Sequence, residues 1–134
     1  MQENIFVGIR KIRKFGLPQT FTSETIVLVI KNHAIKNYLE DELGLDGYSV
    51  ESYDRPQEFI RDIADGMDYD VLAVELNGDV NNARENLLQI SQSANNPAEV
   101  ISFSDRNYFP RASDLHLVNP SKEHLREVIL GYIQ

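Results

Sequence analysis

Polar residues that could do chemistry stand at the ends of four short apolar runs of the sequence. In chain order they are Lys31 and Asn32, Glu75, Ser104, and Asn119. The carboxyl ends of parallel strands meet at one edge of a sheet, near the point where the strand order reverses, so we expect these residues around one pocket. A lysine ammonium repels a divalent cation, and a single carboxylate supplies few of the oxygen ligands that Mg²⁺ prefers. This set of residues therefore disfavours a Mg²⁺ site.

Acid–base or nucleophilic catalysis has little support in the sequence. Glu75 with His33 is the one acid–base pair available near that edge. No Gly-rich phosphate loop follows the first apolar run, where IKNHAIKN stands, and there is no nucleophile elbow. His33, His116 and His124 are not spaced as metal ligands, and the chain has no cysteine. We therefore expect no enzymatic activity, no cofactor and no metal.

Composition is that of one globular domain: 134 residues, 42% apolar and 25% charged. No apolar run approaches the roughly 20 residues that span a bilayer, and the N-terminus does not look like a signal peptide. The net charge of −8 is uneven, because residues 1–24 carry +2 and the remainder carries −10. An acidic body argues against nucleic-acid binding. These features predict a soluble, cytoplasmic protein, and they leave room for a basic protein partner.

The elements that would position the polar residues alternate regularly along the chain. β-Branched apolar runs predict strands buried on both faces, and apolar stripes at helical spacing follow each of the first three runs and the last. The expected strands are 26–30, 48–53, 71–76, 100–103 and 115–118. The expected helices begin after Asn32, near Pro56, near Asp79 and after Ser121. The alternation predicts a doubly wound five-stranded parallel α/β sheet.

Four segments resemble the response-regulator receiver family, whose members are CheY-like. They are TIVLVIKN, YDVLAVEL, VISFS and LHLVNP, and they follow one another in the family's order. The resemblance covers residues 25–134 and implies the flavodoxin-like strand order 2-1-3-4-5. It also implies a bacterial signalling or two-component context.

The residues at the family's functional positions have nevertheless changed. The family has an acidic pair where this chain has Lys31 and Asn32, a phosphoacceptor aspartate where Glu75 stands, and a lysine where Asn119 precedes proline. Only Ser104 keeps the family's residue type. The resemblance therefore implies a pseudo-receiver with a degenerate phosphoacceptor pocket. One hypothesis is that the Lys31 ammonium reaches Glu75 and replaces the metal ion; the alternative is that both are ordinary solvated rim residues.

The fourth crossover is unusually short. Ser104 and Asn119 are 15 positions apart, fewer than is usual in the family, and the segment between them contains Pro110 and has no amphipathic period. This predicts a shortened or missing fourth helix. Two aromatic residues of the segment, Tyr108 and Phe109, could fold back over the uncovered sheet, or the gap could form a docking face.

His116 lies on the fifth expected strand, at the place of the family's switching aromatic. A lone histidine at such a position is more often a packing residue than a pH sensor or a ligand. We include His116 with Tyr108 and Phe109 in the candidate interaction surface.

Residues 1–24 lie outside the resemblance. Ile5, Phe6, Ile9, Ile12 and Phe15 recur at helical spacing opposite Arg10, Lys11, Arg13 and Lys14. The pattern predicts a basic amphipathic helical extension, although NIFVGI could instead form a strand. It could pack on the domain itself, exchange with a second copy, dock on an acidic partner, or bind a membrane. Self-packing or exchange is favoured, and membrane binding is the least favoured. Phe6, Ile9 and Arg13 are its candidate interaction residues.

These observations favour a phosphorylation-independent, receiver-like signalling module that acts by protein–protein interaction. A homodimer through the N-terminal segment or the fourth-crossover face is one form of such an interaction. The alternative is a small-molecule-sensing or enzymatic flavodoxin-like domain that uses the pocket at the carboxyl ends of the strands.

Overall fold

The computed structural model describes residues 24–93, 98–108 and 110–133. Five strands form one parallel sheet in the order β2-β1-β3-β4-β5. The strands are β1 (Thr25–Val29), β2 (Ser49–Tyr53), β3 (Val71–Glu75), β4 (Glu99–Ser104) and β5 (Leu115–Val118). The helices are α1 (His33–Leu45), α2 (Pro56–Ala64), α3 (Val80–Ser93) and α4 (Lys122–Ile133). The doubly wound sheet and its strand order are confirmed.

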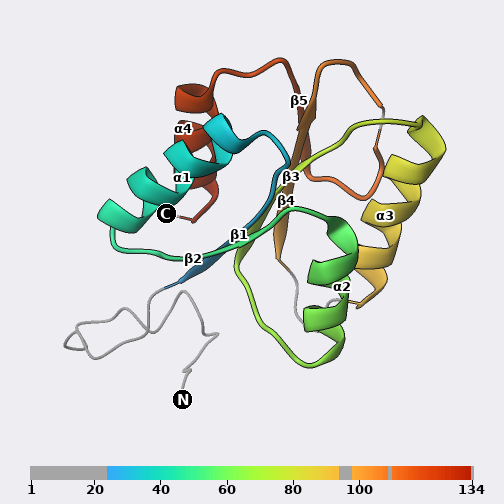
Figure 1. Cartoon of the computed structure of the whole chain (residues 1–134), viewed down its shortest axis with the longest axis horizontal. Helices are drawn as coiled ribbons and strands as arrows, with labels where there is room; N and C mark the ends of the chain where they lie inside the picture. The colour runs from blue at the N-terminus through green and yellow to red at the C-terminus, as the bar shows by residue number, and fades with distance from the viewer. Residues whose placement is uncertain (1–23, 94–97, 109, 134) are drawn as a thin grey trace.

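The helices cover the two faces of the sheet in pairs. In Figure 1, α1 and α4 lie on one face, and α2 and α3 lie on the other. Local signals in the sequence account for several helix starts. Asn32 caps α1 by accepting a hydrogen bond from the backbone N–H of Ile35 at 3.1 Å, and Pro56 occupies the first turn of α2.

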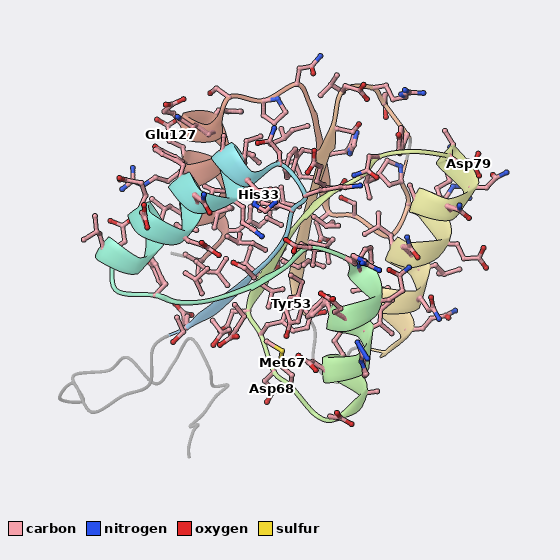
Figure 2. The ribbon with its side chains drawn as sticks, in the orientation of Figure 1. His33, Tyr53, Met67, Asp68, Asp79 and Glu127 are labelled. Carbon is pink, nitrogen blue, oxygen red and sulfur yellow. The ribbon has the colours of Figure 1, made fainter. Side chains whose placement is uncertain are left out.

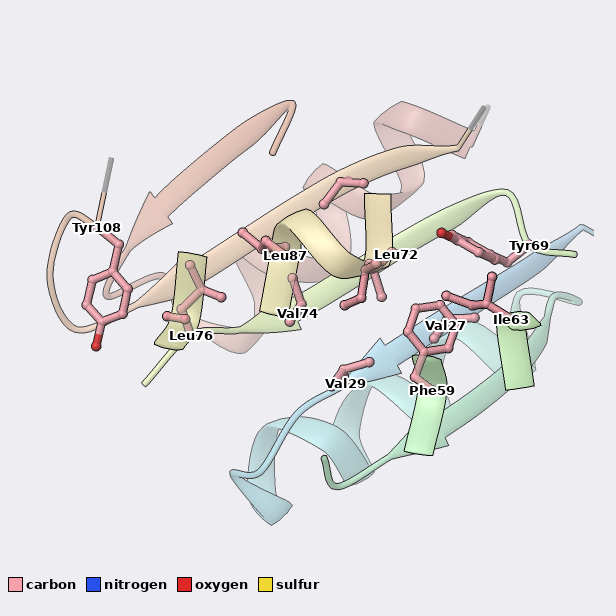
Figure 3. Close-up of a cluster of buried hydrophobic side chains, with 13 residues drawn as sticks. Val27, Val29, Phe59, Ile63, Tyr69, Leu72, Val74, Leu76, Leu87 and Tyr108 are labelled. Carbon is pink, nitrogen blue, oxygen red and sulfur yellow. The ribbon is translucent and has the colours of Figure 1, made fainter. Parts of the chain in front are cut away.

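Each face has its own apolar core. The core under α2 and α3 runs from Tyr69 at one end of the sheet to Tyr108 at the other (Figure 3). The core under α1 and α4 is built from alternate residues of the same strands, so that β1, β3 and β4 are almost completely buried. This two-sided burial explains why these strands read as continuous apolar runs in the sequence.

The fourth crossover contains no helix in its described part, residues 105–108 and 110–114. It passes from β4 to β5 as bends and a turn, in agreement with the expected loss of the fourth helix. The predicted N-terminal helical extension, with Phe6, Ile9 and Arg13, lies outside the described residues. Within the described ranges, no helix is long and apolar enough to cross a membrane.

Candidate functional site

Glu75 closes the carboxyl end of β3 and is tied to the loop that follows β1. Its Oε1 atom accepts hydrogen bonds from the backbone N–H groups of Lys31, at 2.9 Å, and Asn32, at 3.0 Å. The two strands are neighbours in the sheet, with Val29 beside Val74. Hydrogen bonds from amides to a carboxylate are stronger than those between neutral groups. The carboxylate is therefore held against the β1–α1 loop.

The predicted pairing of Lys31 with Glu75 takes a different form from the one hypothesised. The backbone amide of Lys31, and not its ammonium, contacts the carboxylate. Among the ion pairs of the described residues, none within 4.0 Å joins Lys31 to Glu75. The amides at the strand end need an acceptor and lie within reach of the longer glutamate side chain. The exposed ammonium would gain little from an ion pair in water.

This arrangement does not fit the divalent cation that the receiver fold implies. Mg²⁺ needs several oxygen ligands, usually including one or two carboxylates. Here Lys31 brings a positive charge to the position, and the side-chain oxygen of Asn32 already accepts the capping bond of α1. Oε1 of Glu75 is occupied by two amides. In the described chain, no group of three or more metal-ligating side chains is present.

Ser104 and Asn119 form a second, separate contact at the ends of β4 and β5. The backbone N–H of Asn119 donates to the carbonyl oxygen of Ser104 at 2.7 Å. The hydroxyl of Ser104 donates to the carbonyl of Arg106 and accepts from the backbone N–H of Arg106. Among the described residues, no side-chain hydrogen bond links this pair to Glu75. The five predicted pocket residues therefore divide into two hydrogen-bonded groups along one sheet edge.

Tyr108 fills the space that a fourth helix would cover. Its side chain is 1% exposed, and Figure 3 shows it beside Leu76 at the end of the core. Its hydroxyl donates to the carbonyl of Gly78 at 3.0 Å, and its own carbonyl accepts from Nε of Arg84 at 2.8 Å. The structure therefore supports self-packing for Tyr108, which is not free to contact a partner. The side chain of Phe109 lies outside the described residues.

Beneath this crossover the sheet presents polar side chains in place of apolar ones. Ser102 of β4 is fully buried and lies beside His116 of β5 in register. The hydroxyl of Ser102 is 2.7 Å from Nδ1 of His116, whose Nε2 is 3.1 Å from the carbonyl oxygen of Arg106. The ring of His116 also stacks on Tyr108, with centroids 6.4 Å apart. His116 is thus a packed, hydrogen-bonded residue that connects β5 to the crossover.

The hydrogen-bonded network of Ser102 and His116 was not predicted, although the sequence contains a signal for it. In VISFS, serine alternates with apolar residues at period two, which places both serines on one face of β4. A polar stripe on an otherwise buried strand indicates hydrogen bonding to a loop, because buried polar groups need partners.

A cavity of about 500 Å³ opens between α2 and α3 at the carboxyl ends of β1 and β3. Its polar rim includes Lys31, His33, Asp54, Arg55 and Glu75, and apolar side chains form its floor. His33 is seen at the start of α1 in Figure 2. Of the five predicted pocket residues, only Lys31 and Glu75 line this cavity, which extends along the helices to residues that the strand-end rule did not identify.

A smaller cavity of about 330 Å³ lies between α3 and the fourth crossover. Its walls are apolar, with an arginine contributed by each side, and Leu88 at its mouth is 50% exposed. The residues that line it are Arg84, Leu87, Leu88, Pro110, Arg111 and Ala112. Its Arg84 also donates to the carbonyl of Tyr108, so the cavity adjoins the crossover, whose described residues form no helix.

Comparison with known proteins agrees with this architecture. No protein-family model matches the sequence, and no curated protein matches it. Solved structures do match. A receiver domain from Methanospirillum hungatei has a TM-score of 0.69 at 17% identity, covering 82% of this chain and 93% of its own. Vibrio cholerae chemotaxis protein CheY4 has a TM-score of 0.68 at 18% identity, covering 83% of this chain and 99% of its own.

A third match is the receiver domain of a sensor histidine kinase from Pseudomonas aeruginosa, a structure with a magnesium ion coordinated in its active-site cleft. Its TM-score is 0.62 at 19% identity, and the match covers 84% of this chain and 98% of that one. At sequence identities this low, the matches show a shared fold and do not show a shared function. The strand order, the helix placement and these three matches together lead to one conclusion: the chain has the fold of a CheY-like response-regulator receiver domain.

Proposed function

We propose that this chain is a phosphorylation-independent receiver-like module that acts by binding a protein partner. The observation that carries the proposal is the hydrogen bonding of Glu75 to the amides of Lys31 and Asn32. A phosphoacceptor must present a free carboxylate oxygen in line with the phosphodonor, and misplacement by an ångström is poorly tolerated. Here one oxygen is engaged by the loop, and glutamate displaces the other by the length of a methylene.

The charges around Glu75 support the same proposal. The magnesium ion in the P. aeruginosa receiver shows what that domain's cleft can hold. In this chain the corresponding loop brings Lys31, whose ammonium repels a divalent cation. Asn119 brings no positive charge toward a phosphoryl group, and its backbone is bonded to Ser104 instead. The residues at these positions therefore disfavour three functions together: binding of a divalent cation, acceptance of a phosphoryl group by Glu75, and contact between a positive side chain and that phosphoryl group.

The rebuilt fourth crossover is the surface that we propose for partner binding. Arg84 and Arg111 flank the apolar cavity beside Leu88, whereas Arg106 on the same crossover is paired with Asp105. The two arginines at the cavity stand out in a chain with a net charge of −8. A partner segment that carries acidic and apolar side chains would complement them. A second copy of this acidic chain fits less well.

Phosphorylation independence is tested by mass spectrometry. The protein is incubated with acetyl phosphate or phosphoramidate and Mg²⁺, and its intact mass is measured over time beside a phosphorylatable receiver as the positive control. We expect no added phosphoryl group at any time at which the control is modified. A mass increase of one phosphoryl group at Glu75 would overturn the proposal.

The partner surface is tested with a charge-reversal variant. The double variant R84E/R111E is compared with wild type and with K122E, which changes a charge on the opposite face of the sheet, in affinity capture from cells of the source organism. A specific partner is expected to be lost from R84E/R111E and retained by K122E. Equal recovery with all three proteins would show that the crossover is not the binding surface. Light scattering of the purified protein reports separately whether it forms a dimer.

A further inference from the structure

We infer that the cavity between α2 and α3 binds a small organic carboxylate with an apolar body, such as an aromatic or short aliphatic acid. The inference goes beyond the proposed protein interaction, because it concerns a different surface and a different kind of ligand. It rests on the composition of the cavity walls and on the charges at the mouth.

The walls of the cavity are suited to an apolar body. Val29, Val74 and Leu76 contribute from the ends of β1 and β3, and α3 contributes Ala83, Leu87 and Ile90. Each of these side chains is at most 4% exposed, so the floor belongs to the core. A volume of about 500 Å³ is within the range of small-molecule sites. Besides the charged rim, the uncharged polar residues Gln57, Asn77 and Asn86 line the cavity and could orient a ligand on this apolar floor.

The acidic groups at the mouth are already compensated. Asp54 forms a hydrogen-bonded ion pair with Lys36, whose ammonium lowers the pKa of that carboxyl, and His33 and Arg55 act in the same direction. Glu75 accepts two backbone amide bonds. Neither carboxylate therefore requires a cationic ligand.

The cations at the mouth are less fully compensated: Arg55 acts on Asp54 only through space, without an ion pair. Lys31 and Arg55 both line the cavity, and within the described chain neither forms an ion pair within 4.0 Å. An arginine fork can bind a carboxylate through two parallel hydrogen bonds, and a nearby lysine adds a point charge. The mouth therefore favours a carboxylate over a neutral or cationic head group. The apolar floor accommodates an apolar body beneath that carboxylate.

The experiment uses 2-naphthoate as the probe, with two analogues that share its ring system. These are the neutral 2-naphthamide and the cationic 2-naphthylmethylamine. Each is titrated into ¹⁵N-labelled full-length protein, and amide shifts are followed by NMR. We expect saturable shifts in α2, α3 and the β1–α1 loop with the carboxylate, at least about tenfold tighter binding than with the amide, and weaker binding still with the amine.

Variants separate this site from unspecific binding. K31Q and R55Q change exposed side chains and are each expected to weaken 2-naphthoate binding about three- to tenfold. R61Q serves as the matched control, because Arg61 is an exposed arginine of α2, the helix that Arg55 precedes, and lies outside the cavity. Circular dichroism verifies that each variant is folded. The inference is overturned by the absence of saturable binding, by equal affinity for the amide, or by K31Q and R55Q binding as tightly as R61Q. The phosphodonor experiment is independent of all these outcomes.

Discussion

Oε1 of Glu75 lies 2.9 Å from the backbone nitrogen of Lys31, across the boundary between two adjacent parallel strands. This contact makes the Glu75 carboxylate a hydrogen-bond acceptor for the loop after β1. In our proposal Glu75 stands in place of a phosphoacceptor aspartate and has this structural role instead. The first prediction follows directly from it.

Removing the Glu75 carboxylate should destabilise the domain. In E75A, the amides of Lys31 and Asn32 lose their shared acceptor, and hydrogen bonds to a charged group contribute more than neutral ones, so we expect a loss of about 1–2 kcal/mol in the free energy of unfolding. E75Q keeps an acceptor oxygen and should lose less. Urea denaturation measures both, with E85A on the exposed face of α3 as the control. Equal stability of E75A and E85A would contradict the structural role.

Tyr108 should behave as a core residue and not as a surface residue. Y108A removes a large side chain that is 1% exposed, so we expect a loss of about 3–5 kcal/mol. Y108F removes only the hydroxyl that donates to Gly78, with an expected loss of about 1 kcal/mol. Chemical denaturation of both variants measures the difference. A Y108A protein as stable as wild type would mean that the crossover does not pack on the sheet.

Asn119 adopts a backbone conformation that most residues avoid. Its φ is 49°, in the left-handed region, where asparagine and glycine are tolerated. We expect N119G to change stability by less than about 0.5 kcal/mol and N119V to lose about 1–2 kcal/mol. Thermal denaturation of the two variants distinguishes them. Equal thermal stability of N119V and N119G would show that the positive φ at this position causes no strain.

High pH should lower the free energy of unfolding, because the buried Tyr69 loses its proton more readily once the chain unfolds. Burial raises the pKa of Tyr69 to about 12, from an ordinary value of about 10. The unfolded chain therefore loses this proton first, and stability present below pH 10 falls as the pH rises toward 12, by roughly 2–3 kcal/mol in full. Denaturation at several pH values should show this decline in wild type and a smaller one in Y69F. A decline of the same size in Y69F would assign it to other groups, among which Tyr53 also has a raised pKa.

Much of the architecture was predictable because local patterns decide it. The expected strand 115–118 matches β5, and the expected strand 71–76 differs from β3 by one residue. The lack of a helix in residues 105–108 and 110–114 was predicted from the length of the crossover and from Pro110. Each of these depends on residues close together in the sequence, where periodicity and turn chemistry are informative.

The side-chain contacts of the site were less predictable. Lys31 and Glu75 are 44 positions apart in the sequence. Whether the Glu75 carboxylate contacts the ammonium or the backbone amide of Lys31 depends on which donor lies closer once β1 and β3 are paired. The hydroxyl of Tyr108 finds the carbonyl of Gly78, 30 positions away, for the same reason. The cavity between α2 and α3 depends on how two helices pack over the sheet. Such distances are set by tertiary packing, which periodicity does not encode.

The most direct test of the central claim is an NMR titration of the ¹⁵N-labelled protein with Mg²⁺ and then with beryllofluoride, a mimic of the phosphoryl group. The degenerate pocket predicts no saturable shift of the amides of Lys31, Asn32 and Glu75 at any step. The quadruple variant K31D/N32D/E75D/N119K, which restores the family's residue types, serves as the comparison for regained Mg²⁺ binding. Saturable, magnesium-dependent binding of beryllofluoride by the wild-type chain would contradict the account.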